Sequence, residues 1–180
     1  MYCDLERSGG SLRTVSLLAG LLLFAGCTAS ASTRVDLDGF WQFKTDASNQ
    51  GESAGWAQRM PAGTESGRVP GTWSVVRKYY YYVGDAWYFK RFTFPSGFRD
   101  QHVELHFGAT FYKSRVWLNG TELGGHEGGY TAYYFDITPY LKPINYLAVK
   151  IDNRPGVATI PGWAMRDSHK PGRWYDWWPD

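Results

Sequence analysis

Short stretches in which large apolar residues alternate with other residues constrain the fold of this chain more than any other feature. Residues 102–107 read HVELHF and residues 146–152 read YLAVKID, with a large aliphatic or aromatic residue at every second position. Alternation with period two is typical of a β-strand that buries one face. Residues 113–118 and 121–123 flank Asn119-Gly120, and Asn-Gly between two strands predicts a tight hairpin because both residues tolerate positive φ.

The rest of the chain also favours strands over helices. Aromatic residues make up 18% of the 180 residues, and such residues are enriched in strands. A short helix is expected at 53–59, before Pro61. No long segment has a helical period or a βαβ rhythm, so the predicted fold class is all-β, an antiparallel β-sandwich. About seven strands are expected, at 40–44, 87–94, 101–107, 113–118, 121–123, 130–137 and 146–152.

The N-terminal segment is predicted to be an export signal that lies outside the fold. Arg7 and Arg13 precede an apolar run at 15–25, VSLLAGLLLFA. A run of this length suits the h-region of a signal peptide and is too short to span a bilayer. We therefore expect residues 1–26 to form a signal peptide.

The sequence FAGC that ends this run resembles the bacterial lipobox, in which the cysteine becomes the lipidated first residue of the mature protein. The resemblance assigns lipidation to Cys27 and makes residues 27–34 a tether. It implies a periplasmic or cell-surface lipoprotein that touches the membrane through the lipid alone. The alternative is an ordinary signal peptide cleaved near Ala29 or Ala31. Cys3 lies in the leader, so no disulfide and no cysteine-based zinc site are expected.

Charge and histidine spacing argue against nucleic acid and metal. The net charge of +2 offers no basic patch for nucleic acid. His102 and His106 would stand roughly 13 Å apart along one strand, because the rise is about 3.3 Å per residue, so they cannot share one ion. No metal site and no cofactor are predicted.

Eight short motifs follow one another along the chain: LDGFWQF at 37–43, VPGTW at 69–73, GDAWY at 84–88, FGA at 107–109, VWLNG at 116–120, GGHEGGYT at 124–131, FDIT at 135–138 and VKIDNRP at 149–155. Taken in this order, they resemble the N-terminal sugar-binding domain of glycoside hydrolase family 2, which contains β-galactosidases, β-glucuronidases and β-mannosidases. The resemblance covers residues 35–180 and implies a jelly-roll, galactose-binding-like sandwich.

The resemblance implies a secreted enzyme that hydrolyses O-glycosyl bonds of β-glycosides, with its chemistry placed in a later (β/α)8 barrel. That barrel supplies two glutamates in the family and needs about 250 residues. We therefore assign no catalytic residue here, and place Glu104, Glu122 and Glu127 on the solvated surface. The domain is expected to be incomplete at its C-terminal end and inactive alone. The missing barrel of the same polypeptide is the expected partner.

Loops of this domain help to shape the sugar subsite in family members, and three segments are candidates: 79–85, 152–154 and 174–180. Polar side chains there could bond hydroxyls or a uronate carboxylate, and aromatic rings could stack on a sugar. The alternative for 79–82 is packing inside the domain or against the next domain. The candidate sugar-binding residues are Tyr82, Asp85, Asn153, Arg154, Asp176 and Trp177.

Two other functions stay open from the sequence. A stand-alone carbohydrate-binding module would hold glycans without cleaving them, and a structural adhesion domain rests on fold analogy alone. Family members often form dimers or tetramers, so a homo-oligomer is a further alternative.

Overall fold

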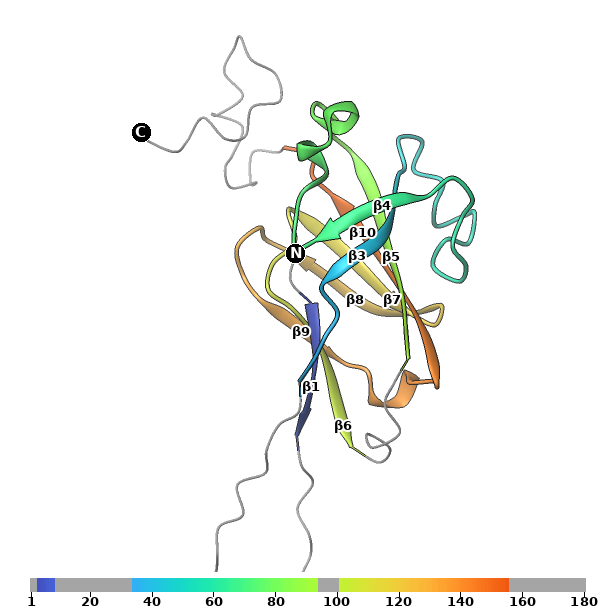
Figure 1. The fold of residues 1–180 in the computed structure, drawn as a ribbon, viewed down its shortest axis with the longest axis vertical. Helices are drawn as coiled ribbons and strands as arrows, with labels where there is room; N and C mark the ends of the chain where they lie inside the picture. Colours follow the sequence, from blue (N-terminus) through green and yellow to red (C-terminus); the bar gives the residue numbers. More distant parts are fainter. Residues whose placement is uncertain (1–2, 9–33, 94–100, 156–180) are drawn as a thin grey trace, which may run out of the picture.

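The computed structural model describes residues 3–8, 34–93 and 101–155. These residues form two antiparallel sheets that pack face to face (Figure 1). Short 3-10 turns occur at Trp73–Val75, Arg77–Tyr79 and Thr138–Tyr140, and the described part of the chain contains no α-helix. The predicted all-β sandwich is confirmed. Within these residues no helix is long and apolar enough to cross a bilayer.

The larger sheet has six strands in the order β4-β3-β5-β10-β7-β8. Strands β5 and β10 lie at its centre and pair along their whole length, from Asp85 opposite Asp152 to Thr93 opposite Ile144. The hairpin of β7 and β8 turns at Asn119-Gly120, as predicted, and Asn119 has a φ of 54°. The six strands are β3 (Gly39–Thr45), β4 (Glu65–Val69), β5 (Asp85–Thr93), β7 (Lys113–Leu118), β8 (Thr121–Glu127) and β10 (Ile144–Asp152).

The smaller sheet has four strands in the order β2-β1-β6-β9. They are β1 (Cys3–Ser8), β2 (Arg34–Asp36), β6 (His102–Phe107) and β9 (Tyr133–Asp136). The expectation that residues 1–26 lie outside the fold differs from the structure at β1, which lies between β2 and β6. The signal peptide and the tether stay predictions, because 9–33 lie outside the described residues.

The main core fills the space between the two sheets. The predicted inward residues Val103, Leu105 and Phe107 of β6 are fully buried, and so are Leu147 and Val149 of β10. Burial of such side chains contributes about 1.5–3 kcal/mol each. The alternation in the sequence therefore predicted the core face of both strands.

A second layer covers the outer face of the six-stranded sheet, which the sequence did not predict. Trp87, Phe89 and Trp117 point away from the main core, yet each is at most 5% exposed. They are covered by the segment that joins β3 to β4, through Trp56 and Met60. With both faces covered, residues 85–89 of β5 are buried without alternation, as expected for a strand inside three layers.

The covering segment is not the helix expected at 53–59. Its backbone hydrogen bonds change spacing from turn to turn: Trp56 N donates to Gly51 O, five residues back, and Gln58 N donates to Gly55 O, three residues back. Gly55 has a φ of +74°, which lies outside the right-handed helical region. Gly51 packs so closely on Trp87 that a Cβ would come within 2.5 Å of its Nε1.

Candidate functional site

Two of the three candidate segments, 79–85 and 152–154, meet at one end of the sandwich because β5 begins there and β10 ends there. Asp85 pairs with Asp152 across the two strands, so the residues before β5 and after β10 lie side by side. Asn153 Oδ1 accepts the N–H of Gly84 at 2.8 Å, and Asn153 N donates to Gly84 O at 3.4 Å. These two bonds fasten the start of β5 to the exit from β10.

Tyr82 belongs to the same group of residues, which we call the β5–β10 cluster and which consists of Tyr82, Asp85, Asp152, Asn153 and Arg154. The Tyr82 hydroxyl donates to Asp85 O, and its own carbonyl accepts the Asn153 amide at 3.4 Å. The Tyr82 ring also lies against Trp73, with ring centroids 6.3 Å apart. Burial raises the pKa of the Tyr82 phenol, so it stays a neutral hydrogen-bond donor at neutral pH.

The carboxylate of Asp85 is buried: 3% of its side chain is exposed. Arg154 reaches both carboxylate oxygens, with Nη1–Oδ1 at 3.3 Å and Nη2–Oδ2 at 3.1 Å. Lys150 Nζ lies 3.8 Å from Asp85 Oδ2, and Asp152 Oδ2 lies 2.9 Å from Arg154 Nη1. The hydrogen bond to Asp85 raises the pKa of the Arg154 guanidinium, which therefore stays charged. A buried carboxylate is expected to hold such partners, because an unpaired buried charge is costly.

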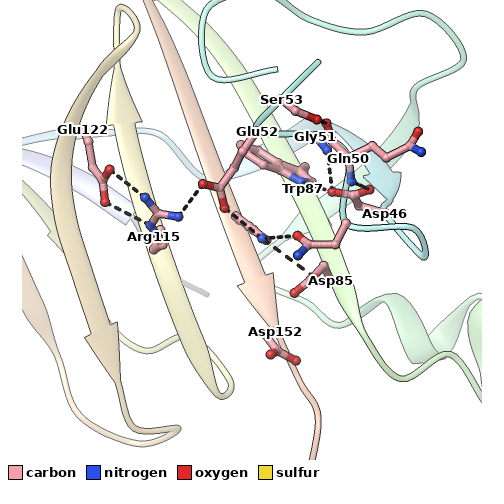
Figure 2. A network of polar contacts seen from close by, with 12 residues as sticks. Asp46, Gln50, Gly51, Glu52, Ser53, Asp85, Trp87, Arg115, Glu122 and Asp152 are labelled. Atoms are coloured by element: carbon pink, nitrogen blue, oxygen red, sulfur yellow. Dashed lines mark hydrogen bonds and ion pairs between the residues drawn. The ribbon is translucent and has the colours of Figure 1, made fainter. Parts of the chain in front are cut away.

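A row of alternating charges extends from this cluster across the outer face of the six-stranded sheet (Figure 2). Lys150 of β10 also contacts Glu52 at 2.9 Å, and Glu52 meets Arg115 of β7. Arg115 in turn bonds both carboxylate oxygens of Glu122 on β8, at 2.8 and 3.0 Å. The row ties the covering segment, which contains Glu52, to three strands.

Asp46 anchors the start of the covering segment, a few residues before Glu52 in the chain. Its carboxylate accepts the backbone N–H groups of Gln50 and Gly51, each at 2.8 Å, and the Trp87 indole N–H at 3.0 Å (Figure 2). Asp46 N donates to Asp85 O at 2.8 Å, so this anchor and the β5–β10 cluster share one carbonyl.

The structure thus brings together four of the six candidate sugar-binding residues: Tyr82, Asp85, Asn153 and Arg154. Their polar groups bond mainly one another and the nearby backbone. Arg154, with 48% of its side chain exposed, faces solvent most. Asp176, Trp177 and the lipidation candidate Cys27 lie outside the described residues. A direct contact between any of the six and a sugar stays a prediction.

Sequence reasoning missed Asp46, Glu52, Arg115 and Lys150 as parts of this network. Lys150 lies 98 residues from Glu52, and Arg115 lies 63 residues from it. The one local indication of this network was Lys150, a charged residue between the apolar residues Val149 and Ile151 of a predicted strand. Strand register and the path of the covering segment were needed to pair these charges.

The other titratable groups considered from the sequence are also paired. The two carboxylate oxygens of Glu104 contact His102 Nε2 at 3.1 Å and His106 Nε2 at 2.9 Å. Glu127 meets Lys113 at 3.0 Å. Among the described residues no group of three or more histidine, cysteine or acidic side chains is arranged to hold a metal ion.

Comparison with known proteins decides the family. Residues 76–177, more than half of the chain, match the family model described as glycosyl hydrolase 2 galactose-binding domain-like. The chain belongs to glycoside hydrolase family 2. The matched residues include both loops of the β5–β10 cluster, so the resemblance seen in the sequence motifs is confirmed.

Relatives in family 2 are much longer than this chain. A β-glucuronidase of Paenibacillus borealis is 28% identical over 131 residues, which are 70% of this chain and 22% of that protein. A β-galactosidase of Bacteroides ovatus is 33% identical over 100 residues, 54% of this chain and 10% of that protein. The solved structure of Ruminococcus gnavus β-glucuronidase is 34% identical with a TM-score of 0.66, covering 70% of this chain and 22% of that one. The chain therefore spans about a fifth or less of these relatives.

The charge row predicts a measurable dependence of stability on acid. Burial raises the pKa of Glu52, but hydrogen bonds from Lys150 and Arg115 outweigh it and the net pKa is below the ordinary 4.5. A lowered folded-state pKa contributes stability above the unfolded pKa, and this contribution is lost as the pH falls through the folded value. Because Glu52 is partly exposed, the loss should be below about 1 kcal/mol.

We expect Glu52→Gln to lose less stability than the parent between pH 6 and roughly pH 3, measured by urea unfolding at each pH. Glu127→Gln, which removes a surface carboxylate beside Lys113, controls for the loss of one negative charge. An acid dependence that is the same in Glu52→Gln and the parent would contradict the assignment.

Proposed function

We propose that this chain is the N-terminal sugar-binding domain of a longer, exported enzyme that hydrolyses O-glycosyl bonds of β-glycosides. One observation carries the proposal: residues 76–177 match the family 2 domain while the chain spans 22% of the Paenibacillus borealis β-glucuronidase. A retaining glycosidase needs two carboxyl groups about 5 Å apart across the scissile bond. Acids of the β5–β10 cluster are paired with cations inside the domain, so the rest of the polypeptide is proposed to supply the catalytic pair.

The β5–β10 end is the proposed sugar-facing part of the domain. Arg154 has an exposed guanidinium that can donate to a hydroxyl or a carboxylate, and Tyr81, which precedes Tyr82, is 70% exposed. Asp85 holds the Arg154 guanidinium, and Asn153 fastens the exit from β10 to Gly84. The relatives named above are a β-glucuronidase and a β-galactosidase, and one Ruminococcus gnavus structure contains D-glucuronic acid. The proposed substrate class is therefore a β-glycoside.

Export is proposed from the sequence of the leader. The apolar run at 15–25 and the lipobox-like FAGC before Thr28 support a periplasmic or cell-surface lipoprotein anchored through Cys27. The proposed partner of the domain is the barrel of the same polypeptide.

The proposal predicts that the purified chain releases no nitrophenol from nitrophenyl β-D-glucuronide, β-D-galactoside or β-D-mannoside. The polypeptide extended through the downstream reading frame is expected to hydrolyse at least one of them. Absorbance of released nitrophenol measures both. Turnover by the chain alone would place the catalytic pair within it. An extended polypeptide that binds sugar without turnover would identify a binding module.

A further inference from the structure

The outer face of the six-stranded sheet is covered in one part and bare in another. The covering segment reaches as far as Tyr146, whose hydroxyl donates to Trp56 O at 2.8 Å. Beyond Tyr146, towards the start of β10 and the end of β5, two large apolar side chains lie in solvent. Phe40 is 73% exposed and Ile144 is 66% exposed. Exposed apolar side chains on one face mark a surface that contacts a partner or a membrane.

Two arginines occupy the same bare part of the sheet. Arg68 of β4 is directly opposite Phe40, and Arg91 of β5 is directly opposite Tyr146. Both arginines are exposed, and among the described residues neither guanidinium has an acidic partner. Phe40 O accepts Lys90 Nζ at 3.1 Å, so the Phe40 ring lies beside this part of β5. We call the surface formed by Phe40, Arg68, Arg91 and Ile144 the basal face.

The chain enters the sandwich beside the basal face. A groove is lined by the incoming residues 35–37 on one side and by 90–93 and Ile144 on the other, and its described lining residues include two cations and one acid. Residues 27–34, which directly precede this point, are the predicted tether. Eight fully extended residues span at most about 28 Å. A lipid on Cys27 therefore keeps the basal face close to the bilayer.

The proposed sugar-facing end lies at the other end of the same strands. Strand β5 runs from Asp85 of the β5–β10 cluster to Thr93, and β10 runs back from Ile144 to Asp152. Nine strand residues extend about 26 Å. Figure 1 shows β10 crossing the sandwich from its lower to its upper end. A bilayer at the basal face therefore leaves the β5–β10 cluster at the end remote from lipid.

We propose that the basal face docks on an anionic phospholipid surface and orients the domain with its β5–β10 end away from the bilayer. This contact adds to the one expected through the lipid on Cys27. Phe40 and Ile144 enter the headgroup region, while the two arginines attract anionic headgroups. The inference rests on the proposed function, because it needs an exported chain held near a bilayer. All four residues lie outside the leader, on a sheet that β1 does not join.

The form of the basal face favours a lipid surface over an acidic glycan. Ile144 has no flat ring on which a sugar could stack. Phe40 lies on β3 and Ile144 on β10, with β5 between them, so the apolar side chains are spread across the sheet. Cations placed between separated apolar side chains suit the broad boundary between headgroups and acyl chains.

Photo-crosslinking to lipid tests the contact. The full chain is expressed with its leader in a bacterium, and the processed product is bound to vesicles of phosphatidylethanolamine and phosphatidylglycerol. A benzophenone amino acid replaces Thr93, which is exposed and lies opposite Ile144. The matched probe replaces Val75, which is 79% exposed and precedes the β5–β10 cluster. We expect lipid adducts at residue 93 to exceed those at residue 75 by about fivefold or more, measured by mass spectrometry.

Charge gives a second test with the same readout. Arg91→Glu should lower the lipid adducts at residue 93 by about fivefold or more, because each cation beside an anionic surface adds to the attraction. Arg77→Glu, which changes an exposed arginine near the other end, should leave them unchanged. Roughly 1 M salt should lower the adducts of the parent chain, since the Debye length is then about 3 Å. The salt test needs no substitution, so it decides the point if Arg91→Glu does not fold.

Equal lipid adducts at residues 93 and 75 would overturn the proposal. Crosslinks to a second chain, or binding of polygalacturonate at the basal face without lipid adducts, would overturn it as well. The mass of the N-terminal peptide separates this inference from the proposed function. A lipidated Cys27 with equal adducts keeps the proposed anchor and removes the docking face. An unmodified Cys27 with adducts selective for residue 93 removes the proposed anchor and keeps the docking face.

Discussion

Replacing Asp46 with alanine is expected to lower the free energy of unfolding by about 3 kcal/mol. Asp46 is 4% exposed, and its carboxylate accepts three hydrogen bonds, from Gln50 N, Gly51 N and Trp87 Nε1. Trp87 is fully buried, so its indole N–H has no route to water once the carboxylate is gone. Each buried donor left without a partner costs about 1–3 kcal/mol, and the covering segment loses the anchor that holds its first turn.

The measurement is urea unfolding followed by tryptophan fluorescence, which reports Trp87 and Trp56 in the layer that the segment covers. Asp36→Ala is the matched control, because Asp36 is exposed and its Oδ1 accepts a single N–H, that of Asp38, at 2.7 Å. The control should lose less than about 1 kcal/mol. Equal losses in the two variants would show that burial of the Asp46 bonds is not what stabilises this segment.

Strands rich in large apolar residues were predictable from the sequence, whether one face or both faces are buried. Strand β6 lies close to its expected bounds because its large apolar residues alternate, and β7 does so because Asn119-Gly120 marks its end. Strand β4 was missed: its sequence ESGRV lacks aromatic residues, and an edge strand needs few apolar contacts. The helix expected at 53–59 was wrong because Gly55 takes a positive φ and the segment follows the sheet beneath it.

The candidate site was predictable as a place but not as a set of contacts. The family resemblance assigned Tyr82, Asp85, Asn153 and Arg154 to loops expected to shape a sugar subsite, and the pairing of β5 with β10 brings those loops together. Burial of Asp85 could not be foreseen, because its side-chain partners Arg154 and Lys150 come from a part of the chain that is distant in sequence. The partners Glu52 and Lys150 are distant in sequence, so no local pattern could pair them.

Replacing Asp85 with alanine is expected to lower the free energy of unfolding by about 2–3 kcal/mol. The change removes a buried acceptor from Arg154 and leaves Lys150, whose side chain is 12% exposed, with Glu52 as its remaining acidic contact in the row. Breaking a buried ion pair by removing one partner costs about 3–5 kcal/mol, and the partial exposure of Arg154 reduces that figure. Glu127→Ala is the surface control, with an expected loss below about 1 kcal/mol.

The double variant Asp85→Ala with Arg154→Ala separates the pair from its surroundings. If the two side chains act mainly on each other, the double variant should be about 1 kcal/mol more stable than the sum of the single losses predicts. Strict additivity would mean that Asp85 acts through Lys150 and the backbone instead.

Activity of the extended polypeptide then decides what this cluster contributes to function. Asp85 cannot reach a ligand in solvent while its carboxylate is buried under Arg154, so an effect on hydrolysis must pass through the position of Arg154 and of the chain after β10. We expect Asp85→Ala to raise KM for the nitrophenyl glycoside by about tenfold at a temperature where the variant is folded. Arg154→Lys, which keeps the charge and loses the paired geometry, should shift KM in the same direction. Unchanged KM in both variants, with stability lowered as expected, would make the cluster a structural brace and move the sugar contact to other residues of the family 2 domain.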